Sequence, residues 1–174
     1  HHVAHESLSP ARDLTERLVL DGTKLAWHMD RVRAWERGER FAPITIDMAL
    51  TRACQASCVF CYAVLQESQS RSNLTKDSLW ALLDDFATIG VRGVSLVSDG
   101  ESTLSPHYGD FIERATSLGI DVGNATNGWR FFPDVAERLL PHLKWVRFTV
   151  LAGRPDSYLH LMHGSVADRH IWDT

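Results

Sequence analysis

The sequence predicts an α/β protein with a parallel β-sheet, and three observations lead to this fold class. Short β-rich runs alternate with helical runs along most of the chain. Strands joined by helical crossovers run parallel. The second, third and fourth β-rich runs begin at 93, 120 and 145, which gives repeats of 27 and 25 residues. Polar segments rich in glycine, asparagine or cysteine follow these runs, where parallel α/β proteins collect their functional groups.

The elements follow from local signals, taken in chain order. Residues 12–37 read as helical, with Gly38 as a stop, and form an N-terminal lead-in over 1–42; the remaining core spans 43–174. Thr75 and Gly90 are suitable as the N-cap and C-cap of one helix. The expected strands are 44–50, 93–98, 120–126 and 145–151. The expected core helices are 74–90, 106–119, one in 133–143 that stops near Pro141, and a fourth that starts at 155.

The composition of the chain limits the classes of function that the protein can have. The chain has 174 residues and a net charge of −4, with 44% hydrophobic and 23% charged residues. This slight acidity argues against nucleic-acid binding, which needs a basic face. No apolar run reaches the roughly 18 residues that span a bilayer. The polar N-terminus lacks a signal-peptide pattern. We therefore expect a cytoplasmic protein that acts neither on nucleic acid nor at a membrane.

All three cysteines lie in one short segment, "TRACQASCVFCYA", as Cys54, Cys58 and Cys61. An odd number of clustered thiols without a signal peptide does not indicate a disulfide framework. A structural zinc site usually closes with four protein ligands. A cubane iron–sulfur cluster has four metal corners, and three thiolates leave one of them open for a substrate or cofactor. The C-x3-C-x2-C spacing lets one loop bind three corners.

The segment resembles the cluster loop of the radical S-adenosylmethionine (SAM) superfamily. That family has an aromatic residue before the last cysteine, where this chain has Phe60, and its loop follows the first strand. The resemblance implies that Cys54, Cys58 and Cys61 bind three irons of a [4Fe-4S] cluster and that SAM chelates the fourth. Reductive cleavage of SAM would give a 5′-deoxyadenosyl radical that abstracts a substrate hydrogen. Phe60 would pack beside the adenine.

A second motif, "VSLVSDGESTLSP", resembles the family segment G-G-E or G-E-P-T-L, which holds the amino group of SAM. Gly100 and Glu101 match it, while Asp99 replaces the first glycine and Ser102 stands where proline is common. A glycine allows close backbone approach, and a carboxylate suits an ammonium group. The resemblance therefore implies SAM contacts from Ser98 through Glu101. The alternative is an ordinary loop whose acids precede a helix.

Two further segments extend the resemblance. "NATNGWRF" resembles a family T-N-G segment at Thr126, Asn127 and Gly128, although Asn-Gly is also an ordinary turn signal. Thr149 occupies the place where relatives often carry a serine that contacts the SAM ribose or carboxylate. Strand alternation should put Arg147 on the same face as Thr149. The resemblance thus adds Asn127 and Thr149 to the SAM site.

The resemblance also implies an architecture and partners. Family members usually build six β/α units as an incomplete barrel with outer helices, and four units are visible here. We expect a partial (β/α) barrel, and either a natural protein that continues beyond Thr174 or a chain that associates.

The resemblance also implies the kind of substrate and electron donor. A small metabolite or a peptide would be the substrate, and a protein such as flavodoxin or ferredoxin would be the external electron donor. No catalytic side chain is identified. If the chain is whole, the lack of further cysteines favours a single-cluster, redox-neutral rearrangement or elimination.

Two other functions compete with this interpretation. A zinc-binding module could combine Cys58 and Cys61 with His160 and His163, but the two-residue spacing between the histidines is short and Cys54 would be unused. An inactive scaffold that binds a partner is the third possibility. The intact cysteine and Gly-Glu motifs argue against it.

Overall fold

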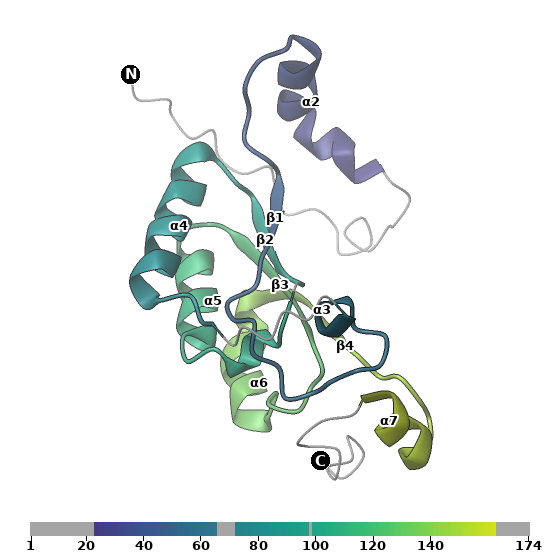
Figure 1. Ribbon diagram of the computed structural model, residues 1–174. Coiled ribbons are helices and arrows are strands. Elements are labelled where there is room, and N and C mark those ends of the chain that lie inside the picture. The colour runs from purple at the N-terminus through teal and green to yellow at the C-terminus, as the bar shows by residue number, and fades with distance from the viewer. Residues whose placement is uncertain (1–22, 66–71, 98, 163–174) are drawn as a thin grey trace. The chain divides into compact units, whose positions relative to one another are not determined.

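The computed structural model describes residues 23–65, 72–97 and 99–162 of the chain (Figure 1). The chain divides into two compact units, residues 1–41 and 42–174. The first unit contains a 3-10 helix, η1 (Thr23–His28), followed by α2 (Met29–Glu36). Gly38 has φ 70°, and its N–H donates to the carbonyl of Trp35, so the expected helix stop is confirmed. Among the described residues, no helix has the length and apolar character that crossing a bilayer requires.

The second unit contains one parallel sheet of four strands in the order β1-β2-β3-β4. A helix lies between each pair of consecutive strands, which confirms the predicted α/β class and the partial β/α barrel. The elements are β1 (Thr45–Asp47), α3 (Tyr62–Leu65), α4 (Lys76–Ile89), β2 (Gly93–Leu96), η2 (Ser102–Leu104), α5 (Tyr108–Ser117), β3 (Asp121–Thr126), α6 (Pro133–Leu139), η3 (Leu140–His142), β4 (Leu143–Phe148) and α7 (Pro155–Met162).

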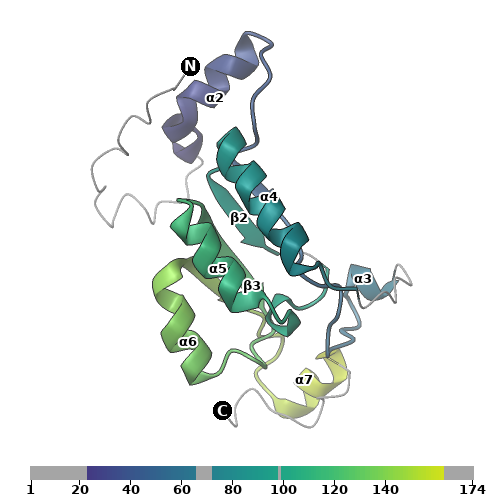
Figure 2. The same ribbon diagram turned by 90° about the vertical axis from the view of Figure 1, so that its left-hand side faces the viewer.

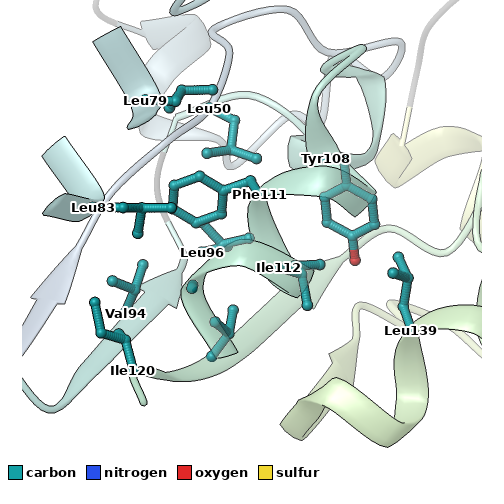
Figure 3. Close-up of a cluster of buried hydrophobic side chains, with 12 residues drawn as sticks. Leu50, Leu79, Leu83, Val94, Leu96, Tyr108, Phe111, Ile112, Ile120 and Leu139 are labelled. Carbon is teal, nitrogen blue, oxygen red and sulfur yellow. The ribbon is translucent and has the colours of Figure 1, made fainter. Parts of the chain in front are cut away.

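Helices α4, α5 and α6 cover one face of the sheet (Figures 1 and 2). The main hydrophobic core lies between them and the strands (Figure 3). Phe111 of α5 is fully buried at its centre, and Val94 and Val122 point into it from β2 and β3. Burying side chains of this size contributes roughly 1.5–3 kcal/mol each before conformational entropy is subtracted. This core fixes the strand ends that carry the polar motifs.

Helix α4 forms as its sequence predicts. The Thr75 hydroxyl accepts a hydrogen bond from the N–H of Ser78 at 3.2 Å, which caps the first turn. Leu79 and Leu83, one turn apart, are both fully buried against the core. Gly90 adopts the left-handed conformation with φ 82° and ends the helix.

Several expected boundaries differ from the structure. Strand β1 has three residues, not the seven of 44–50, since its pairing with β2 ends at Asp47. The helix expected in 133–143, with a stop near Pro141, ends as α6 at Leu139, and a 3-10 turn containing Pro141 follows it. Proline has no N–H to continue a helical ladder. Strand β4 then starts at Leu143, two residues before the expected start at Trp145.

Candidate functional site

The cysteine loop, residues 48–61, connects the carboxyl end of β1 to α3. Its first part is fixed by backbone hydrogen bonds: the N–H of Leu74 donates to the carbonyl of Leu50, and the N–H of Arg52 donates to that of Ser72, both at 3.0 Å. The loop therefore leaves the sheet in a defined direction before it reaches the first thiol.

Two of the three thiols, those of Cys54 and Cys58, have raised pKa values. Cys54 is exposed as a whole residue, whereas Cys58 and Cys61 are half-buried. Protein atoms around the sulfur of Cys54 desolvate it and raise its pKa. Desolvation, followed by the neighbouring Cys54 and Cys61, raises the pKa of Cys58 from 9.0 to about 11. The Cys54 and Cys58 thiols are thus protonated at neutral pH, and binding a metal releases protons from them.

The donor set suits an iron–sulfur cluster in its chemistry. Thiolates are soft ligands that select iron–sulfur clusters, zinc or copper(I). In the described part of the chain, no three Cys, His, Asp or Glu side chains are arranged as a metal site. Cys61 lies close enough to raise the pKa values of Cys54 and Cys58. Binding a common cluster requires the three thiols to turn toward one point.

The loop after β2 packs directly on the cysteine loop through Gly100. This glycine has φ 77°, and a Cβ on it would lie closer than 3.0 Å to backbone atoms of Thr51, Arg52 and Ala53. The N–H of Glu101 donates to the carbonyl of Ala53 at 2.8 Å. Only glycine combines this conformation with this close approach. The close backbone approach that this glycine allows is made to the cysteine loop, and its predicted contact with SAM stays a prediction.

Asp99 forms an ion pair with Arg52, a residue that was not predicted from the sequence motifs. Its carboxylate forms an ion pair with the guanidinium of Arg52 at 3.2 Å. Both side chains keep part of their solvent exposure, so this pair contributes little stability. The pair is a further connection, besides the contacts of Gly100 and Glu101, between the loop after β2 and the cysteine loop. Ser98, the other predicted SAM contact in this segment, lies outside the described residues.

Glu101 is buried, with 4% of its surface exposed, and its carboxylate joins the ends of β2 and β3. Oε1 accepts from the hydroxyls of Thr103 and Thr126, each at 2.8 Å, and from the N–H of Thr103 at 3.2 Å. Oε2 accepts from the N–H of Asn127 at 2.8 Å. Oε1 accepts three of these four hydrogen bonds, so Oε2 has more capacity left for a ligand ammonium.

Asn127 connects the end of β3 to the cysteine loop. Its side-chain oxygen accepts from the amide of Gln55 and from the N–H of Trp129, both at 3.1 Å. Its side-chain nitrogen lies 4.0 Å from the sulfur of Cys54. Asn127 therefore sets the turn after β3 and the position of the first cysteine together. Gln55 was not predicted, since a glutamine between cysteines carries no motif signal.

The two remaining predicted contacts are accessible. Phe60 is 54% exposed on the cysteine loop. Thr149 is half-buried just after β4, and its N–H donates to the carbonyl of Thr126 at 2.9 Å. Arg147 lies on the sheet face opposite the main core, since it pairs with Ala125, and its neighbour Phe148 stacks edge-on against Phe131. Strand β4 ends at Phe148, so the expected placement of Arg147 and Thr149 on one face stays a prediction.

A family model described as the Radical SAM superfamily matches residues 48–173, which include this whole site. The chain belongs to the radical SAM superfamily. This family uses SAM together with an iron–sulfur cluster, and the resemblance of the cysteine loop is confirmed.

Curated relatives of this radical SAM chain are considerably longer. An AdoMet-dependent heme synthase of Methanosarcina barkeri is 32% identical over 98 residues, which cover 56% of this chain and 28% of the relative. Mycofactocin maturase MftC of Mycobacterium tuberculosis is 33% identical over 110 residues, covering 62% and 27%. An S-adenosylmethionine-dependent nucleotide dehydratase of Flammeovirga pacifica is 26% identical over 110 residues, covering 61% and 38%. The chain thus spans well under half the length of each relative.

Solved structures share the radical SAM fold with this chain. Streptococcus suis SuiB bound to the precursor peptide SuiA has a TM-score of 0.61 and 16% identity, covering 90% of this chain and 35% of SuiB. BtrN in complex with AdoMet and 2-DOIA has a TM-score of 0.55 and 13% identity, covering 75% of this chain and 55% of BtrN. At these identities, the likeness concerns the fold.

The zinc alternative rests partly on α7 of the radical SAM unit. This helix does contact Cys58, but the side chain that reaches the sulfur is Met162. His160 is exposed on α7, and His163 lies outside the described residues. Met162 was missed by sequence reasoning because a lone methionine at the end of a helix gives no sign of a partner 104 positions away.

Proposed function

We propose that residues 43–174 form the cluster- and SAM-binding core of a radical SAM enzyme, preceded by a lead-in over 1–42. Cys54, Cys58 and Cys61 hold three irons of a [4Fe-4S] cluster, and SAM occupies the fourth. The observation that carries this proposal is the attachment of the cysteine loop to the ends of β2 and β3 through Gly100, Glu101 and Asn127. When bound, the two cofactors supply radical hydrogen abstraction.

The side chains of this chain bind and orient SAM. Oε2 of Glu101 has capacity for the methionine ammonium, at the place where Gly100 and the N–H of Glu101 meet the cysteine loop. Thr149 offers a hydroxyl at the end of β4 for the ribose or carboxylate. The exposed ring of Phe60 offers an apolar surface for the adenine. Ser98 and Asn127 complete the proposed set.

The substrate of the whole protein is a small molecule or a peptide, and flavodoxin or ferredoxin supplies the electron. Support comes from the names of the relatives, which include a nucleotide dehydratase and mycofactocin maturases, and from SuiB, whose structure contains a precursor peptide. These proteins differ in substrate while sharing the fold of this core.

Metal analysis after anaerobic reconstitution with iron and sulfide tests the proposal. We expect a brown protein with about four irons and four sulfides per chain. Alanine at Cys54, Cys58 or Cys61 should abolish SAM cleavage. His160→Ala is the matched control, because it removes a ligand of the zinc alternative only and should leave iron content unchanged. A protein that binds one zinc instead, and loses it in His160→Ala, would refute the proposal.

A further inference from the structure

Helix α7 contacts the cysteine loop, although the two follow strands at opposite ends of the strand order (Figure 2). The N–H of Ser57 donates to the carbonyl of Met162, and the N–H of Val59 donates to that of Leu161, both at 3.1 Å. The last carbonyls of a helix have no partner within the helix. The loop therefore caps α7, and α7 fixes the loop backbone on both sides of Cys58.

The side chain of Met162 completes this contact. The thiol of Cys58 donates a hydrogen bond to Sδ of Met162, with 3.4 Å between the two sulfur atoms. Met162 is fully buried in a second small core with Tyr158 and Ala56, and the half-buried Cys58 packs against it. The indole N–H of Trp129 donates to the hydroxyl of Tyr158 at 3.3 Å. A flexible methionine is thus held in one place by its surroundings.

Cys54 and Cys58 are therefore contacted by two different parts of the fold. Asn127, after β3, lies beside Cys54, whereas α7 lies beside Cys58. Groups that contact a metal ligand orient it, and their loss weakens metal binding. When Cys58 gives its proton up on binding a metal, its hydrogen bond to Met162 disappears. The packing against Met162 and the two backbone hydrogen bonds, from Ser57 and Val59, then hold Cys58 in place.

We propose that Met162 is a positioning residue for Cys58, and that α7 fixes the place of this cysteine in the loop before a cluster binds. The inference rests on the proposed function, in which Cys58 is a cluster ligand. The contact itself exists without a cluster, so it can be measured on the metal-free chain.

Cysteine alkylation of the metal-free 174-residue chain, mapped by peptide mass spectrometry, is the first test. Met162→Ala removes the packing and should speed alkylation of Cys58 several-fold relative to Cys61 in the same molecule. Met162→Leu keeps the volume and should stay near the wild-type rate. Leu139→Ala is the matched control, because it empties a buried site in the main core and leaves the second core, beside Cys58, intact. Equal Cys58 rates in Met162→Ala and Leu139→Ala would overturn the positioning role.

Iron release to a chelator from the reconstituted chain is the second test. Met162→Ala should lose iron about tenfold faster than wild type, the lower end of the effect for groups that support metal ligands. Met162→Leu should restore retention, and Leu139→Ala should retain iron as wild type does. Met162→Ala retaining iron like Leu139→Ala would overturn the inference. A Cys58→Ala variant with a full cluster would instead refute the proposed function, whatever the alkylation result.

Discussion

Glu101 is a buried carboxylate that faces two hydroxyls and two backbone N–H groups. In Glu101→Gln the amide nitrogen cannot accept a hydrogen bond, so one backbone N–H loses its partner in either orientation of the amide. We expect a loss of about 1–3 kcal/mol in the free energy of unfolding. We also expect SAM to bind about tenfold or more weakly, because a charge-assisted contact is lost.

Chemical denaturation and calorimetric SAM titration measure these two effects of Glu101→Gln. Glu137→Gln is the matched control, because Glu137 is exposed on α6 and should leave both quantities unchanged. Unchanged SAM affinity in Glu101→Gln, with iron content intact, would assign the ammonium to backbone groups or to Asp99. Unchanged stability would contradict the four hydrogen bonds.

The Cys58 thiol makes stability depend on pH in the alkaline range. Desolvation and the two neighbouring cysteines raise its pKa from 9.0 to about 11 in the folded chain. The folded state therefore binds the thiol proton more tightly than the unfolded state, and this contribution is full below pH 9 and is lost as pH rises through 11. Denaturation of the metal-free chain at several pH values should show this loss. A Cys58→Ser chain with the same slope between pH 9 and 11 would contradict the assignment.

Among the elements, the loop after β2 depends on Gly100 for both conformation and space. Gly100→Ala adds left-handed strain, about 1–2 kcal/mol, and places a Cβ against backbone atoms of the cysteine loop. Gly119→Ala is a matched control, since Gly119 has φ 76° and nothing within 4 Å of the added Cβ. We expect Gly119→Ala to lose stability only, and Gly100→Ala to lose more stability and its iron. Equal losses in the two variants would show that the close contact has no role.

Elements with local signals could be predicted from the sequence, and contacts between distant segments could not. Thr75 and Gly90 are the residues directly before and after α4, so the sequence locates both ends of this helix. A glycine at position 100 indicates a close backbone approach, because no other residue type leaves the same space. The partner of Gly100, and the contact of Met162 with Cys58, depend on tertiary packing across tens of residues. The early start of β4 follows from a register shift between Val122 and Gly123, which no residue pattern announces.

At the scale of the whole molecule, strand β4 forms one edge of the sheet in the part of the chain that the structure describes. Within the described residues it pairs with β3 alone, and Trp145 and Val150 near it are 43% and 55% exposed. An open apolar edge promotes pairing with another chain. We predict that the 174-residue chain associates at micromolar concentration and that Val150→Lys reduces association, as measured by light scattering. A stable wild-type monomer would contradict this prediction.

The central claim is that three cysteines hold a cluster whose fourth iron is left for SAM. Electron paramagnetic resonance of the reduced, reconstituted chain tests it most directly, because a ligand that binds an iron changes the spectrum of the cluster. The account predicts a [4Fe-4S] signal that shifts when SAM is added, and no cluster signal in a variant with alanine at Cys54, Cys58 and Cys61. A cluster signal identical with and without saturating SAM would contradict it.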